Sequence, residues 1–173
     1  MKTPPGMSTR PTGDRVKESL FNILNGMINF SEVERVADIF AGTGALGLES
    51  LSRGAKAAVF IDRATADLIR ENSERAKFFD ACEILKSDFE PALKNLSGRE
   101  VQFDLIFSDP PYKTGLAKKS LNLVSELNLL KVGGIMVAEY GAEEVVDGVP
   151  PNFKSVRKIS YGHTTAAEIF CRE

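Results

Sequence analysis

Glycines and acidic residues stand where two short apolar segments of the sequence end. Gly42, Gly44 and Gly47 form a G-x-G-x-x-G pattern at the end of the largely apolar residues 33–40. Glycines at this spacing permit a tight turn from a strand into a helix, and they leave the backbone bare for the close approach of a ligand. The start of such a helix attracts negative charge. The pattern alone is also compatible with a purely structural turn, since any sharp strand-to-helix connection can use glycines.

Two carboxylates near the glycines favour a ligand-binding site over a purely structural turn. Asp62 ends the next apolar run, residues 57–61, at the distance from the glycines where an acidic side chain can accept hydrogen bonds from a ribose. Asp38 lies inside the first apolar run, and a carboxylate buried there is costly unless it is paired. A pyrophosphate over the glycine turn gains nothing from this negative charge. The sulfonium and ammonium groups of S-adenosylmethionine would gain from it, so the pattern favours a methyl-donor site over a nicotinamide site.

A second set of chemically capable residues, Asp109-Pro-Pro-Tyr112, follows the apolar run 103–108. Pro110 and Pro111 stiffen the chain and donate no backbone hydrogen bonds, so acceptor groups project from a rigid turn. We expect the Asp109 carboxylate and the Pro110 carbonyl to accept hydrogen bonds from a planar NH₂ group. Tyr112 offers a flat face on which a base can stack. An ordinary strand-ending turn would explain the prolines but not the acid and the aromatic ring.

Further residues could contact the donor from neighbouring positions. Asp88, after the short run 82–86, could accept a hydrogen bond from an adenine amine while Phe89 covers the ring. A helix N-cap is an equally good account of Asp88. Arg15 lies on an amphipathic helix expected at 10–24, where it could pair with a carboxylate of the ligand.

A small basic group is the candidate for contacts with nucleic-acid phosphates. Lys113, Lys118 and Lys119 follow the Pro-Pro turn closely, and we add Arg10 from the start of the chain. Three lysines on a loop and a helix start are also typical of a solvated face. The formal net charge of −2 gives no indication of nucleic acid, whereas a strongly basic domain would have been a positive sign.

Alternating strands and helices must position these residues. Strands are predicted at 33–40, 57–61, 82–86, 103–108 and 135–140, with a terminal hairpin at 153–160 and 164–171. Helices are predicted at 10–24, from 45 to about 52, at 66–79 and up to 129, and loops at 131–134 and 141–152. We expect a loose tail over residues 1–9 and one domain over 10–173.

Composition narrows the classes of protein that the chain can represent. The 173 residues are 43% hydrophobic, which is enough for one sizeable core. Cys82 and Cys171 lack Cys or His partners at ligand spacing, so we expect reduced thiols, no metal and a cytoplasmic protein. No apolar run approaches the roughly 18 residues needed to span a bilayer, and the first residues lack the apolar centre of a secretion signal. We therefore expect no membrane partner, and a monomer.

Three motifs occur in order along the chain: Arg-Pro-Thr-Gly-Asp-Arg-Val-Lys-Glu-Ser-Leu-Phe-Asn at 10–22, Asp-Ile-Phe-Ala-Gly-Thr-Gly-Ala-Leu-Gly-Leu-Glu-Ser-Leu-Ser-Arg-Gly-Ala at 38–55, and Phe-Asp-Leu-Ile-Phe-Ser-Asp-Pro-Pro-Tyr at 103–112. Together they resemble the bacterial small-subunit ribosomal RNA guanine-N2 methyltransferase family. The resemblance implies an α/β fold of the Rossmann-like class I methyltransferase type. Its seven-stranded sheet would be mostly parallel, with helices on both faces and a C-terminal antiparallel hairpin.

The resemblance also implies the ligands. S-adenosylmethionine would be the donor, S-adenosylhomocysteine the product, and the exocyclic N2 amine of a guanine in 16S rRNA the acceptor, within a partly assembled small subunit. Residues at the family's donor-binding positions are Asp38, Gly42, Gly44, the ribose-binding Asp62 and the adenine-contacting Asp88. We place Phe40, Ala41, Thr43, Arg63 and Phe89, which adjoin them, in the same site. The catalytic motif would be Asp109, Pro110, Pro111 and Tyr112.

The expected chemistry is direct displacement by an amine that Asp109 and the Pro110 carbonyl hold in line with the methyl group. Methylation at carbon-5 of a pyrimidine needs a thiolate, and no Cys lies near the Pro-Pro turn. Adenine-N6 methylation of DNA or RNA remains the first alternative, since the turn does not identify the base. An NAD-dependent oxidoreductase and a non-catalytic RNA-binding module are the others.

Overall fold

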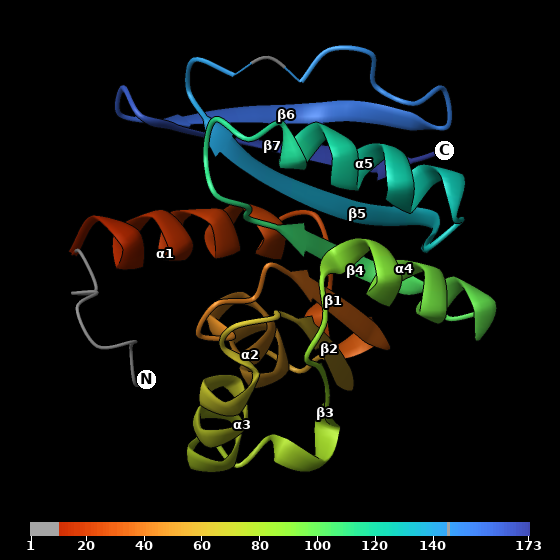
Figure 1. Ribbon diagram of the computed structural model, residues 1–173. Coiled ribbons are helices and arrows are strands. Elements are labelled where there is room, and N and C mark those ends of the chain that lie inside the picture. Colours follow the sequence, from red (N-terminus) through yellow and green to blue (C-terminus); the bar gives the residue numbers. More distant parts are fainter. Residues whose placement is uncertain (1–10, 145) are drawn as a thin grey trace.

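The computed structural model describes residues 11–144 and 146–173, which form a seven-stranded sheet with helices on both faces (Figure 1). Arg10 and the expected tail over 1–9 lie outside the described residues. The strands are β1 (Arg35–Ile39), β2 (Ala57–Ile61), β3 (Cys82–Leu85), β4 (Phe103–Ser108), β5 (Leu130–Gly141), β6 (Phe153–Tyr161) and β7 (Thr165–Arg172). The helices are α1 (Pro11–Asn25), α2 (Ala45–Ser52), α3 (Ala66–Arg75), α4 (Phe89–Gly98) and α5 (Leu116–Glu126), with short 3₁₀ turns at Phe30–Glu32 and Phe79–Ala81.

The strand order is β3-β2-β1-β4-β5-β7-β6. Strands β1 to β5 pair in parallel, whereas β7 is antiparallel to both β5 and β6. The predicted architecture, with its terminal antiparallel hairpin, is therefore confirmed. The chain changes direction across the sheet between β1 and β4, and in open α/β sheets such a switch point is where ligands bind.

Each face of the sheet has its own hydrophobic core, and different helices cover the two faces (Figure 1). Helices α1 and α2 contribute Leu20, Phe21, Leu24, Leu48 and Leu51 to one core. Helices α4 and α5 contribute buried side chains to the other core. None of the described helices is long and apolar enough to cross a membrane.

The structure corrects several predicted boundaries. The loop expected at 131–134 belongs to β5, which begins at Leu130 and accommodates Gly133 at a φ of 78° near a register shift against β4. A glycine at such a bulge interrupts the regular strand geometry, but the strand continues beyond it. The helix expected at 66–79 ends at Arg75, because Lys77 adopts a φ of 62°. The helix expected to continue to 129 ends at Glu126, and the first strand is Arg35–Ile39 rather than 33–40.

Candidate active site

A cleft of about 1330 Å³ lies at the carboxyl ends of the central strands. Residues after β1, β2, β3 and β4, together with the first turns of α4 and α5, form its walls. From the predicted donor site, it is lined by Phe40, Gly42, Asp62, Arg63, Asp88 and Phe89, and from the predicted catalytic turn by Asp109, Pro110, Pro111 and Tyr112. One cavity thus brings together the two motifs that are far apart in the sequence.

The three glycines of the turn have different structural roles. Gly42 has a φ of 55°, and a Cβ built on it would meet no atom within 4 Å. Its bare backbone therefore faces open space, as a ligand site requires. Gly44 is the N-cap residue of α2 at a φ of 78°. At Gly47 a Cβ would lie 2.3 Å from the Phe60 ring, so this glycine allows α2 to pack closely on β2.

Asp62 anchors the cleft end of β2. One carboxylate oxygen accepts a hydrogen bond from the Gly42 amide at 3.0 Å, and the other accepts from the amides of Ala64 and Thr65 at 2.8 and 2.9 Å. These bonds hold the acid against the glycine turn. Its position at the cleft is the one predicted for a group that accepts from a ribose.

Two aromatic rings form the neighbouring wall. Phe40 adopts a φ of 63°, which is unfavourable for a bulky side chain and concentrates at functional sites. Its ring centroid lies 4.9 Å from that of Phe89. Asp88 is the backbone N-cap residue of α4, but its side chain makes no capping bond and instead pairs with Arg63 at 3.2 Å. The carboxylate therefore stays at the cleft surface.

Asp38 lies behind the cleft wall rather than in it. Its side chain is buried, and its Oδ2 accepts a hydrogen bond from the Gly47 amide at 2.9 Å, so it is paired within the protein. Burial, opposed by this bond and assisted by the charges of Asp109 and Asp62, raises the pKa of Asp38 to about 8. Ala41, Thr43 and Gly44 also do not line the cleft; the Thr43 carbonyl accepts from the Asn72 side chain.

The Asp109-Pro-Pro-Tyr112 turn continues β4 into the cleft. The Asp109 amide donates to the Ile39 carbonyl at 3.4 Å, which keeps the turn next to β1. Asp109 retains contact with solvent, yet surrounding protein partly desolvates it and raises its pKa to about 6. The Pro111 carbonyl accepts from Thr114 Oγ1 at 2.6 Å, whereas no described residue donates to the Pro110 carbonyl. That carbonyl is thus available as an acceptor.

Tyr112 presents its ring at the cleft mouth, where 42% of the residue is exposed. Its hydroxyl oxygen accepts a hydrogen bond of 3.3 Å from Thr165 at the start of β7. Burial first, and then the charges of Asp109 and Glu139, raise the pKa of Tyr112. The neutral ring is suited to stacking against a base.

Neither Arg15 nor the three lysines predicted to contact phosphates line the cleft, although Lys119 lies over the ring of Phe89, which does line it. Arg15 is exposed on α1 and lines a separate hollow of about 630 Å³ that also includes Arg157 of β6. The three lysines each pair with a carboxylate: Lys113 with Glu143, Lys118 with Asp147, and Lys119 with Glu90.

Glu139 was not among the predicted site residues, although the sequence carries a signal for it. It is an acidic residue within the otherwise apolar run 135–140, as Asp38 is within its own strand. Only 8% of Glu139 is exposed. Burial, followed by the charges of Asp109 and Asp38, raises its pKa to about 8. The sequence alone does not show which residues Glu139 faces.

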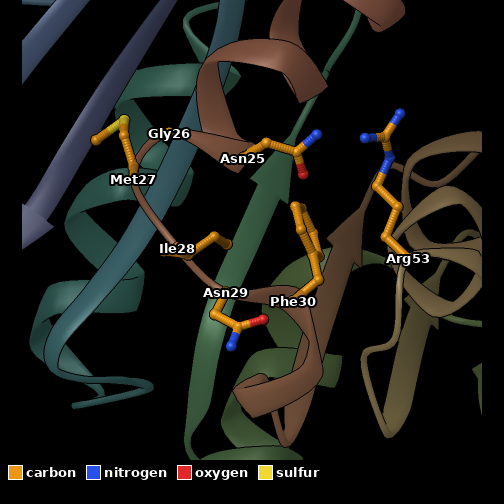
Figure 2. A pocket seen from close by; sticks show the side chains of 7 residues that line it. All are labelled: Asn25, Gly26, Met27, Ile28, Asn29, Phe30 and Arg53. Carbon is orange, nitrogen blue, oxygen red and sulfur yellow. The ribbon is translucent and has the colours of Figure 1, made fainter.

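A second hollow, of about 460 Å³, lies between the end of α1 and the residues before β1 (Figure 2). Its lining consists of Asn25, Gly26, Met27, Ile28, Asn29, Phe30 and Arg53. These residues provide no carboxylate or nucleophile, and the Arg53 guanidinium is occupied by Glu49 and the Phe21 ring. This hollow therefore offers no chemistry comparable with that of the cleft.

Comparisons with known proteins identify the family to which the chain belongs. The chain matches the family described as Conserved hypothetical protein 95 over residues 1–169. The ribosomal RNA small subunit methyltransferase D of Escherichia coli K12 is 33% identical over 175 residues, which cover 100% of this chain and 84% of that protein. The protein of the same name from Haemophilus influenzae is 38% identical over 133 residues, which cover 75% of this chain and 67% of that protein.

Solved structures show the same fold. A chain from Escherichia coli has a TM-score of 0.85 and 31% sequence identity, with 100% of this chain and 91% of that chain covered. The O-methyltransferase from Bacillus cereus in complex with SAH has a TM-score of 0.71 at 16% identity, covering 98% of this chain and 84% of that chain. At this identity the second likeness supports the fold alone.

The sheet topology and the likeness to solved methyltransferase structures define the class I methyltransferase fold, and the relatives named above make the protein an S-adenosylmethionine-dependent methyltransferase. The chain belongs to the ribosomal RNA small subunit methyltransferase D family, matched here as Conserved hypothetical protein 95.

Proposed function

We propose that this protein transfers a methyl group from S-adenosylmethionine to the exocyclic N2 amine of a guanine in 16S rRNA. The observation that carries the proposal is the position of the Asp109-Pro-Pro-Tyr112 turn, which shares one cleft with Gly42 and Asp62. The names of the relatives support ribosomal RNA of the small subunit as the substrate. We further propose that the protein acts as a monomer on a partly assembled subunit.

The donor side of the cleft fits S-adenosylmethionine, which supplies an electrophilic methyl group when bound. The cleft volume of about 1330 Å³ accommodates a nucleoside with its amino-acid tail. Gly42 leaves the backbone open, Asp62 offers acceptor oxygens for a ribose, and the rings of Phe40 and Phe89 offer flat faces for an adenine. Asp88 would accept from the adenine amine, and its ion pair with Arg63 would rearrange to allow this.

The acceptor side of the cleft would orient the amine by accepting hydrogen bonds from its two N–H groups. The lone pair of an exocyclic amine is delocalised into the base. The Asp109 carboxylate and the Pro110 carbonyl would accept hydrogen bonds from the two N–H groups, which raises the electron density on nitrogen and fixes its direction. Tyr112 would hold the unpaired base by stacking. Asp109 would also accept the proton that the nitrogen loses on methylation and pass it to water. Because only an ionised Asp109 accepts in this way, the transfer rate is expected to rise with pH through about 6.

The identity of the base is tested by transfer from labelled S-adenosylmethionine. The purified protein is incubated separately with naked 16S rRNA, small-subunit particles and DNA, and the products are digested to nucleosides and identified by mass spectrometry. We expect N2-methylguanosine from a small-subunit substrate. N6-methyladenosine would replace our proposal with the adenine alternative, and RNA binding without transfer would indicate a non-catalytic module.

A further inference from the structure

Glu139 lies beside Asp109 at the carboxyl edge of the sheet. Strands β4 and β5 pair in parallel, with Ser108 opposite Ala138. The next residues are therefore Asp109, which directly follows β4 and whose amide still donates to the Ile39 carbonyl of β1, and Glu139 within β5. Adjacent positions on paired strands bring side chains within interaction distance when both point to the same face.

Both side chains point to the face that α1 and α2 cover. Side chains alternate between the faces of a strand. Phe107 and Val137, two residues before Asp109 and Glu139, belong to the core on that face. Asp38 is registered opposite Phe107 and takes the same side. Two strands, β1 and β5, and the turn that follows β4 between them thus present one carboxyl group each to the same region.

The two adjacent carboxyl groups have different access to water. Glu139 is 8% exposed, and no hydrogen bond to its carboxyl group is found within the described residues. Asp109 opens into the cleft and is solvent-accessible. A negative charge is therefore more costly on Glu139 than on Asp109, and two close carboxyl groups disfavour each other's ionisation. The direction of the pKa shifts agrees, with Glu139 raised to about 8 and Asp109 to about 6.

The other groups around Glu139 do not reverse this preference. Tyr112 from the catalytic turn and Tyr161 from β6 both experience the Glu139 charge, which raises the pKa of each tyrosine. Arg157 of β6 and the Ser19 hydroxyl of α1 act on Tyr161. Asp38 of β1 adds a further carboxyl group, so the surroundings of Glu139 favour its protonated form.

We propose that Glu139 is a positioning residue of this active site: it keeps its proton at neutral pH, so that the negative charge stays on Asp109, the carboxylate that meets the acceptor amine. The role of Asp109 toward the amine rests on the proposed function. The location of the proton on Glu139 follows from burial and register, and it can be tested in ligand-free protein.

The direct test is a pH titration of the ligand-free protein by carbon-13 NMR of labelled Asp and Glu carboxyl groups. We expect the Glu139 signal to titrate with a midpoint above pH 7. We also expect the Asp109 signal to move in two steps, the second at the Glu139 midpoint. Glu139→Gln should remove the first signal and the second step, whereas Glu126→Gln, an exposed control on α5, should change neither. A Glu139 midpoint below about pH 6, closer to the ordinary range, would refute the proposal.

Kinetics provide the second readout. Gln resembles a protonated Glu but cannot ionise, so the pH profile of kcat for Glu139→Gln should lack the inflection that the unmodified protein shows at the Glu139 midpoint. A loss of kcat greater than about tenfold, with S-adenosylhomocysteine binding intact, would show that an ionised Glu139 is needed. If Glu139→Gln does not fold, the titration of the unmodified protein decides the matter. That titration needs no RNA, so failure of the unmodified protein to methylate rRNA would refute the proposed function separately.

Discussion

Gly47→Ala tests whether the third glycine serves packing rather than ligand binding. A Cβ at this position would lie 2.3 and 2.7 Å from two atoms of the Phe60 ring, which is fully buried and cannot move aside freely. Overpacking of this kind costs about 1–3 kcal/mol. The gain in helix propensity from Gly to Ala is at most about 1 kcal/mol. A contact of 2.3 Å belongs in the upper half of the overpacking range, so after the propensity gain is subtracted we expect a net loss of about 1–2 kcal/mol in the free energy of unfolding.

The assay is urea unfolding followed by circular dichroism, with Gly98→Ala as the matched control. Gly98 ends α4, and a Cβ there meets no atom within 4 Å, so the control should gain about 0.5 kcal/mol. The Gly47→Ala loss corresponds to about 2–8 °C in Tm for a chain of this size. The loss should shrink in a Phe60→Leu background because the two positions are in contact. If Gly47→Ala instead stabilises the protein as the control does, the steric reasoning is wrong.

Asp109→Ala should lower the methyl-transfer rate, measured by single-turnover kinetics, by about 10²-fold or more. Its affinity for S-adenosylhomocysteine, measured by calorimetry, should stay within about threefold of that of the unmodified protein. Retained turnover or lost binding would contradict the role of Asp109. Asp62→Ala removes the proposed ribose acceptor and the anchor of the Gly42 amide, so calorimetry should show binding of S-adenosylhomocysteine weakened about 10–100-fold, and unchanged affinity would exclude the contact. For Asp38 the folded-state pKa is raised, so the folded protein binds the extra proton between pH 4 and about 8 and loses stability as pH rises through that window. Asp38→Asn should remove the Asp38 part of this loss and leave the parts that come from Asp109 and Glu139, whose pKa values are also raised. Urea unfolding at pH 5 and pH 8 that shows the same pH dependence in both proteins would refute the assignment.

The residue pattern alone predicted the bounds of a strand correctly where a short apolar run lies between turn-forming residues. The strands at 57–61 and 103–108 are found with the predicted bounds, and Gly54 ends the helix region after α2 at a φ of 118°. The pattern failed at 131–134, where glycines lie in a strand that bulges. Composition cannot distinguish a bulge from a loop, because the difference depends on the partner strand.

The sequence identified the two motifs that share the cleft of the candidate site, but not the contacts of the residues around them. The sequence shows that Asp38 lies in a buried strand, but not that its partner is the Gly47 amide rather than a cation. The lysines after the catalytic turn suggested phosphate contacts, yet their ion-pair partners come from distant segments. Glu139 could not be assigned to the site from the sequence either, because only the register between β4 and β5 shows that it lies next to Asp109.

The central pairing of β1 with β4 joins segments that the chain separates by three helices and two strands. A break in the connection at 99–102 would divide the enzyme into a piece with the glycine turn and Asp62 and a piece with the Pro-Pro turn. Each piece would bear a bare strand edge, one along β1 and one along β4, and neither would contain a whole cleft. Each fragment alone would therefore be inactive. Activity would return only if the two fragments paired along these strand edges and rebuilt the sheet.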